Sequence, residues 1–206
     1  MQPSVAKRLL NKFRCIAACL LATASVCGSA AVITIGTDAS WLATNVAPAA
    51  TWNTDAAFDT STWINASVNI PSCQPLSDCI WYDGQFSATG NAWLRKTFNL
   101  SGPASSAILV GGVDDDADIF VNGVLVLSDH NGFAANFGPL DVTSLLVPGV
   151  NLIAVNATDN IPVFGQNHDF VALLTVNVPL PGVLSLFLIG LGGLVIARRP
   201  RWPLNR

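Results

Sequence analysis

Short apolar segments separated by turn-forming residues fill positions 32–178, and they restrict the fold more than any other feature of this chain. The segments are rich in β-branched and aromatic residues, with Gly, Pro, Asn and Asp between them. No segment places apolar residues at the 3.6-residue spacing of an amphipathic helix. The pattern predicts strands at 32–36, 92–100, 107–113, 118–128, 151–158 and 170–178. Several such strands in one domain predict an all-β fold, a β-sandwich.

Two turn signals support this interpretation. Asn122-Gly123 lies between the apolar runs "IFV" and "VLV", a pattern typical of a hairpin with a two-residue type I′ turn. Pro148-Gly149 precedes "VNLIAV" and predicts a turn that leads into another strand.

The charge of residues 32–178 is strongly negative. All 13 acidic residues of the chain are aspartates within this range, and only Arg95 and Lys96 oppose them, so its net charge is −11. This charge excludes nucleic acid as a partner and favours cations. The absence of Glu and the scarcity of Lys argue against surface helices, which use these residues often.

The two ends of the chain differ from the middle. Residues 1–31 combine a basic start, an apolar run at 15–26 and small residues before position 32, which predicts a secretory signal peptide. Residues 179–206 contain an apolar run and end with arginines. The run predicts one transmembrane helix at about 180–197, with the arginines on the cytoplasmic side and residues 32–178 outside.

The C-terminal tail resembles the PEP-CTERM sorting signal. Val178, Pro179, Leu180 and Pro181 precede the apolar run, and Arg198 and Arg199 follow it. Leucine stands where the commonest form has glutamate, so the tail is similar to the VPLP variant. The resemblance implies processing by an exosortase-type enzyme. It also implies export through the inner membrane, with transient anchoring by the C-terminal helix, to the cell envelope, the outer surface or the medium.

Two cysteines, Cys73 and Cys79, remain once the predicted signal peptide is removed. Both lie in "SCQPLSDC", and an even pair in an exported protein predicts a disulfide.

Residues 92–160 resemble the galactose-binding-like jelly rolls, such as the sugar-binding domains attached to β-galactosidases and rhamnosidases. Three blocks follow one another in the order found in that family: "WLRKTFNL", "VDDDADIFVNGVLV" and "LDVTSLLVPGVNLIAVNATDN". The third block contains the positions of its "DVT..L..G.N.IAV" pattern: Asp141, Val142, Thr143, Leu145, Gly149 and Asn151. The resemblance implies the fold; its members include binding domains, enzyme appendages and scaffolds.

The aspartates at 114, 115, 116 and 118 allow two interpretations. Asp114, Asp115, Asp116 and Asp118 are either structural residues of a turn or part of a Ca²⁺ site, the one cofactor this chain suggests. An EF-hand is excluded, because Ile119 and Leu125 stand where that loop needs Gly and Glu. If the four residues continued one strand, Asp115 would lie on the face opposite the other three. A cluster within one turn does not suit glycoside cleavage, which needs two carboxyl groups across a cleft.

Trp81, Tyr82 and Asp83 follow the predicted disulfide loop directly. An aromatic pair beside a carboxylate is typical of a carbohydrate-binding surface, provided that the loop holds it in solvent. Tryptophan fills sandwich cores equally well.

Three functions are compatible with these features. The first is an exported, non-enzymatic binding module associated with carbohydrate or an extracellular polysaccharide matrix. The second is a structural protein of the envelope or biofilm matrix with no small ligand. The third is an accessory domain of a glycoside hydrolase. No nucleophile motif or paired catalytic acid is present in the sequence, so we expect no enzymatic activity.

Overall fold

The computed structural model describes residues 30–73, 77–82, 90–160 and 169–179, with the backbone alone at 70–73. The predicted signal peptide lies almost wholly outside these residues, as does the predicted transmembrane segment. Within the described ranges, no helix is long and apolar enough to cross a membrane. Residues 30–179 form one compact unit.

This unit is all-β, with one short 3₁₀ helix, η1 (Thr143–Leu145). The strands are β1 (Ala30–Gly36), β2 (Leu42–Thr44), β3 (Ile64–Asn65), β4 (Ser67–Cys73), β5 (Ser77–Trp81), β6 (Asn91–Leu100), β7 (Ser106–Asp114), β8 (Asp116–Val121), β9 (Val124–Asp129), β10 (Ala135–Asp141), β11 (Gly149–Thr158) and β12 (Asp169–Pro179). Each of the six segments predicted to be extended lies within these strands, with 118–128 forming the hairpin β8–β9, so the all-β prediction is confirmed.

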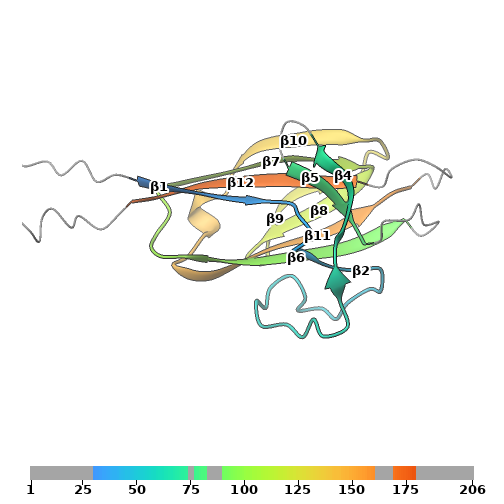
Figure 1. Cartoon of the computed structure of the whole chain (residues 1–206), viewed down its shortest axis with the longest axis horizontal. Helices are drawn as coiled ribbons and strands as arrows, with labels where there is room; N and C mark the ends of the chain where they lie inside the picture. The colour runs from blue at the N-terminus through green and yellow to red at the C-terminus, as the bar shows by residue number, and fades with distance from the viewer. Residues whose placement is uncertain (1–29, 74–76, 83–89, 161–168, 180–206) are drawn as a thin grey trace, which may run out of the picture. The chain divides into compact units, whose positions relative to one another are not determined.

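The strands form two six-stranded sheets that pack as a β-sandwich (Figure 1). One sheet has the order β10-β7-β12-β5-β4, and β1 also pairs with β12. The other has the order β3-β2-β6-β11-β8-β9. Every pairing between these strands is antiparallel. Ala30 pairs with Pro179, so both ends of the described unit lie at the same end of the first sheet.

Apolar side chains from the inner faces of both sheets fill the space between them. β12 alternates buried and partly exposed residues along almost its whole length, as expected of a strand with one covered face. In β11 the run Asn151–Val155 is buried without alternation. Ile153 and Val155 join the main core, whereas Leu152 and Ala154 belong to a second cluster, which means that both faces of β11 are covered.

That second cluster lies beneath the segment 45–63, which connects β2 to β3. Trp52 is buried against Leu152 and Ala154, with Phe58, Trp63, Trp93 and Phe120 packed around it. The Trp52 ring meets Phe120 edge-on with 6.0 Å between the centroids. The segment has no strands of its own, and these aromatic contacts hold it on the sheet.

Both predicted turns are present. Asn122 and Gly123 have φ values of 47° and 82°, the left-handed pair that a type I′ hairpin turn requires. Gly149 has a φ of 91° and begins β11 directly after Pro148.

The aspartate run does not continue one strand, so the predicted alternation is wrong. Asp114 ends β7 in the first sheet, where it pairs with Asp169. Asp116 begins β8 in the second sheet, where it pairs with Thr158. The chain passes from one sheet to the other at Asp115. The aspartates on either side of it belong to different strands, so alternation along a single strand does not decide where their side chains lie.

Candidate functional site

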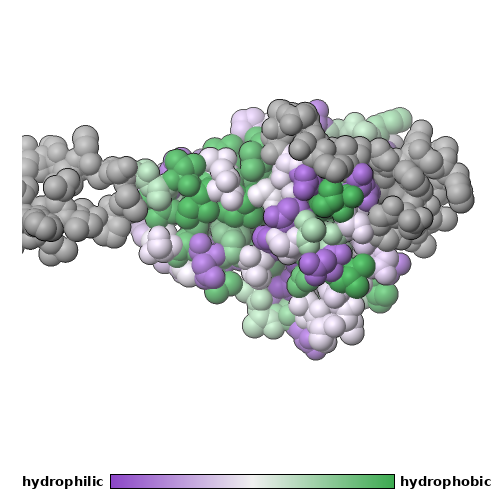
Figure 2. Space-filling model, in the orientation of Figure 1, coloured by the Kyte–Doolittle hydropathy of each residue, from purple (hydrophilic) through white to green (hydrophobic). Residues whose placement is uncertain are grey.

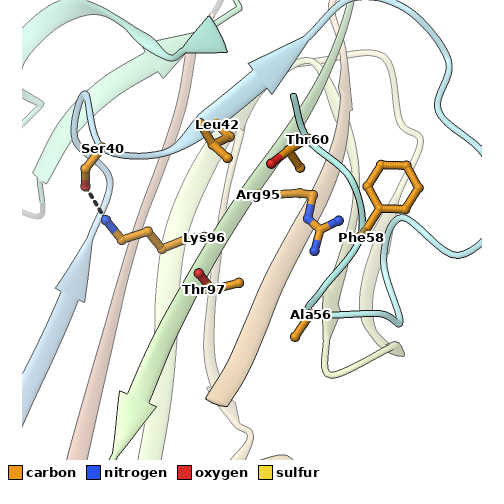
Figure 3. A pocket seen from close by; sticks show the side chains of 8 residues that line it. All are labelled: Ser40, Leu42, Ala56, Phe58, Thr60, Arg95, Lys96 and Thr97. Carbon is orange, nitrogen blue, oxygen red and sulfur yellow. Dashed lines mark hydrogen bonds between the residues drawn. The ribbon is translucent and has the colours of Figure 1, made fainter. Parts of the chain in front are cut away.

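A pocket of about 160 Å³ opens at the side of β6, between that strand and the segments 38–42 and 56–60 (Figure 3). Arg95, Lys96 and Thr97 of β6 form one wall. The remaining lining residues come from β2 and from the chain before and after it: Ser40, Leu42, Ala56, Phe58 and Thr60. Along β6, the contact with β2 covers only residues 93–95. Within the described residues, the edge of β6 that faces β2 therefore has no strand partner beyond Arg95.

Arg95 is 3% exposed, although it lies on the face of β6 that turns away from the main core. Its Nη2 donates to the backbone oxygen of Asp55 at 2.8 Å, and its guanidinium carbon lies 5.1 Å from the centre of the Phe58 ring. The second nitrogen, Nη1, is buried and has no partner among the described residues. Burial lowers the pKa of Arg95, and the negative charge of Asp55 opposes this effect.

The Lys96 side chain extends from the side of β6 opposite Arg95 (Figure 3). Its Nζ donates to Ser40 Oγ and lies 3.6 Å from Asp38 Oδ1 (Figure 3). Burial acts to raise the pKa of Asp38, but hydrogen bonds from Ser40 and the charge of Lys96 keep it below its usual value. The ammonium group therefore holds the turn that carries Ser40 against β6.

The sequence contained a signal for this pocket that our prediction did not use. Arg95 and Lys96 are adjacent and are the only cations of residues 32–178. That both residues border one pocket depends on how the segment 45–63 folds over the sheet, and that segment has no periodic pattern.

The four predicted Ca²⁺ ligands lie at the end of the unit where β7 and β8 meet, and three of them bond to loops. Asp115 Oδ2 accepts from the backbone of Asn160 at 3.0 Å. Asp116 accepts from Gly132 N at 2.7 Å and from the Asn160 side chain. Asp118 Oδ1 lies 3.1 Å from His130 Nε2.

Asp115 and Asp116 thus share Asn160 as a partner, whereas Asp118 contacts His130. In the part of the chain that the structure describes, no group of three or more His, Cys, Asp or Glu side chains is arranged to hold a metal ion. The Ca²⁺ site at Asp114, Asp115, Asp116 and Asp118 stays a prediction.

The surroundings of Asp114 raise its pKa. Burial, a hydrogen bond with Asp115 and the charges of Asp115, Asp159 and Asp169 raise the pKa of Asp114 from 3.8 to about 6. Between these values the folded state holds a proton that the unfolded state has lost. The contribution of Asp114 to stability is therefore largest below pH 4 and falls as the pH rises through about 6.

We expect Asp114→Asn to remove this part of the pH dependence, because an amide still donates to Asp115 but carries no charge. A shift of this size corresponds to at most about 3 kcal/mol. Asp114 is partly exposed, so we expect the variant to gain about 1–2 kcal/mol over the parent protein at pH 7.5 and nothing at pH 4. Urea unfolding at both pH values, with EDTA present to exclude cations, measures the difference.

Asp141→Asn is the matched control for this measurement. Hydrogen bonds from the side chain and backbone of Thr143 lower the pKa of Asp141, so its contribution is lost as the pH falls, the opposite sign. If Asp114→Asn kept the pH slope of the parent, the clustering of carboxylates at this end would not determine that slope.

The predicted carbohydrate surface at Trp81 is wrong. Trp81 is 1% exposed and belongs to the main core, because β5 continues the chain as a strand where we expected a loop. Tyr82 also packs against this core, and Asp83 lies outside the described residues.

The other predicted site residues are described in part. Cys79 is disulfide-bonded; the side chain of Cys73, its predicted partner, lies outside the described part. Val178 is buried in the core near the end of β12, and Pro179 is the last residue of that strand. Leu180, Pro181, Arg198 and Arg199 lie outside the described residues.

No family model and no curated protein matches this sequence. Among solved structures, the chain is similar to a glycosyl hydrolase family 2 member from Bacteroides cellulosilyticus, with 22% identity and a TM-score of 0.47 over 69% of this chain and 20% of that one. It is also similar to Bacteroides uniformis β-glucuronidase, with 19% identity and a TM-score of 0.45 over 71% of this chain and 18% of the glucuronidase chain. A third similar structure is Amycolatopsis orientalis exo-chitosanase CsxA, with 19% identity and a TM-score of 0.45. That similarity covers 70% of this chain and 20% of the chitosanase chain.

This chain therefore spans about a fifth of the length of each of these proteins. Similarity at these identities and scores assigns neither a family nor an activity to it.

Proposed function

We propose that this protein is an exported, surface-sorted, non-enzymatic binding module of extracellular polysaccharide, with a galactose-binding-like jelly-roll fold and a tail processed by an exosortase-type enzyme. Export and sorting rest on the predicted signal peptide and on the tail with Val178-Pro179-Leu180-Pro181 and the terminal arginines. The binding role rests on the pocket beside β6.

The single observation that carries the binding role is the chemistry of the pocket lining. Phe58 offers an aromatic ring, while Ser40, Thr60 and Thr97 offer hydroxyl groups, and two cations supply further donors. Sugars present apolar faces and hydroxyl groups together, and such mixed walls suit them. The pocket is smaller than a drug-sized ligand site, so it fits a small part of a polymer.

The position of the carboxylates supports a role without catalysis. No carboxylate belongs to the pocket lining. Asp38, Asp55 and Asp59, which lie close in sequence to lining residues, accept hydrogen bonds from the backbone of Ser40, Ala57 and Ser61. Glycoside cleavage needs two carboxyl groups across the scissile bond, and among the described residues the grouped carboxylates lie elsewhere, where β7 and β8 meet.

The two ends of β12 differ in their surroundings. Pro179 is the last residue of the strand, whereas Asp169 pairs with Asp114 at the other end, roughly 33 Å away along the strand. Hydrophobic residues gather on the face around the start of β1, where Val32 is 63% exposed (Figure 2).

We expect Phe58→Ala to weaken retention on the preferred polysaccharide about tenfold, because stacking on an aromatic ring is lost. Affinity electrophoresis of the purified protein through gels containing a panel of bacterial and plant polysaccharides measures this. Phe133→Ala is the control: Phe133 is 72% exposed and lines no part of the pocket. If no polysaccharide retarded the parent protein, the structural envelope protein would be the better interpretation.

A further inference from the structure

We propose that the pocket beside β6 recognises an acidic sugar unit, whose carboxylate binds Arg95, with Lys96 supplying a second positive charge on the other side of the strand (Figure 3). This inference rests on the proposed binding function and names the class of saccharide. It follows from where the positive charges lie, from the unsatisfied donor of Arg95 and from the groups around it.

The placement of the cations is the first observation. Residues 32–178 carry 13 negative charges, and their only two positive side chains are adjacent in sequence and line the same pocket. The rest of this range therefore repels a polyanion, and the pocket is the place where an anionic group meets opposite charge. In a recognition site of this kind, the negative surface repels the rest of an anionic polymer. The polymer is therefore held with one acidic unit at the pocket.

The state of Arg95 is the second observation. A buried charge normally has a partner of opposite charge, because burial without one is costly. Among the described residues Arg95 forms no ion pair; its contacts are a backbone oxygen and the Phe58 ring. The guanidinium fork matches the two oxygens of a carboxylate, and Nη1 is left to donate.

A purely structural role for Arg95 explains only half of this arrangement. The bond from Nη2 to Asp55 and the contact with Phe58 anchor the segment 45–63 on the sheet. The hydrogen bond leaves the buried Nη1 without a partner in the described part of the chain. A loop anchor alone would need no unpartnered donor on a residue that lines a pocket.

Lys96 and the hydroxyl groups complete the recognition. The Nζ of Lys96 contacts Ser40 and lies 3.6 Å from Asp38, so of the two cations it is the one already held in place by a counter-ion. Ser40, Thr60 and Thr97 surround the cations and suit the ring hydroxyls of a sugar that carries the carboxylate.

The test compares two ligands with the same sugar backbone, one of which carries carboxylates and the other neutral methyl esters. Tetragalacturonate and its fully methyl-esterified form are titrated into the purified full chain by calorimetry at low salt and at 0.5 M salt, roughly the range over which screening becomes strong. We expect the acid to bind at least about tenfold more tightly at low salt, the gain of a charge-assisted bond, and this ratio to shrink at high salt.

The variants locate the effect. Arg95→Lys keeps the charge but removes the fork, and Lys96→Gln removes the second charge. Damage to the fold would weaken both ligands equally, whereas loss of the carboxylate contact lowers only the ratio of their affinities, which we expect to approach one. Ser101→Asp is the control, since it makes the same change of net charge as Lys96→Gln at an exposed turn after β6.

Each outcome decides the proposal. Equal binding of acid and ester overturns the acidic-sugar inference and leaves the binding module intact. The same holds if neither ligand binds while a neutral polysaccharide does. An acid preference that survives in both variants would place the site elsewhere and also overturns the inference. If nothing in the ligand panel binds, the inference and the proposed function fail together.

Discussion

Replacing Asn151 with alanine is expected to lower the free energy of unfolding by about 3 kcal/mol, and the melting temperature by roughly 6–12 °C. Asn151 is fully buried, and its side chain makes four hydrogen bonds. Its Oδ1 accepts from Val147 N at 2.9 Å and from Asn122 Nδ2 at 2.8 Å. Its Nδ2 donates to the backbone oxygens of Val147 and Gly149. Alanine removes all four bonds and leaves a polar cavity.

The effect should extend to the hairpin, because Asn122 joins the same network. Asn122 Oδ1 accepts from Leu152 N at 2.8 Å, and its Nδ2 also donates to the backbone of Leu145. Asn122→Ala and Asn151→Ala are therefore expected to be non-additive, with a coupling energy of at least about 0.5 kcal/mol in a double-mutant cycle. Chemical denaturation of the parent, both single variants and the double variant measures it.

Asn131→Ala is the control for this prediction. The Asn131 side chain also makes local hydrogen bonds, to Asp129 and Phe133, but it is exposed, so we expect a change within about 0.5 kcal/mol. If Asn151→Ala cost no more than Asn131→Ala, water would be replacing the lost bonds, and the network would not hold the hairpin against β11.

The network shows what the sequence could predict of the fold and what it could not. The stretches "IFVNGVLV" and "LVPGVNLIAV" correctly predicted a hairpin, a turn and a strand, because each is set by residues a few positions apart. It did not show that Asn122 and Asn151 bond to each other, or that Thr143 Oγ1 accepts from Ala107 N at 2.8 Å. Those contacts depend on strands that meet only in the folded protein.

Strands without a regular pattern were missed for similar reasons. β10 contains Gly138-Pro139, which reads as a turn, yet it lies at the edge of its sheet, where a register shift between Phe137 and Leu140 accommodates proline. β2 and β3 are too short to show alternation, and their pairing partners decide their structure.

The candidate site was the least predictable part. Trp81 looked like a surface aromatic because a predicted loop preceded it, and the structure buries it in a strand. Phe58 and Arg95 become neighbours only because three aromatic residues of the segment 45–63 pack on the outer face of the second sheet. The aromatic residues that pack in this way are not regularly spaced in the sequence. By contrast, the sequence shows directly that Arg95 and Lys96 are the only two cations of residues 32–178.

Gly111→Ala is expected to destabilise the protein by about 3 kcal/mol, although the neighbouring Gly112→Ala should change stability by less than about 1 kcal/mol. The two glycines are equivalent in the sequence, where "GG" interrupts an apolar strand. In the structure, a Cβ on Gly111 would lie 2.1 Å from the backbone oxygen of Val171 and 2.4 Å from the Phe137 ring. A Cβ on Gly112 would meet most closely the Asn136 side-chain oxygen, which can move away.

The cost at Gly111 should be large because neither obstacle can yield cheaply. The Val171 oxygen belongs to the central strand β12, and Phe137 lies directly opposite Gly111 on β10. The Phe137 ring stacks on Phe170, which in turn meets Trp41 edge-on, so a displaced ring disturbs the middle of the core. Thermal unfolding gives the stability, and near-ultraviolet circular dichroism reports whether the aromatic stack survives.

A second substitution separates the two obstacles. If the ring contributes to the clash, Phe137→Leu should cost less in the Gly111→Ala background than in the parent protein, because the smaller side chain leaves room for the new methyl group. The backbone contact with Val171 remains, so rescue should be partial. Equal costs for Gly111→Ala and Gly112→Ala would mean that β7 shifts enough to admit the methyl group, and that the close approach of β7 to β12 is not what requires glycine at position 111.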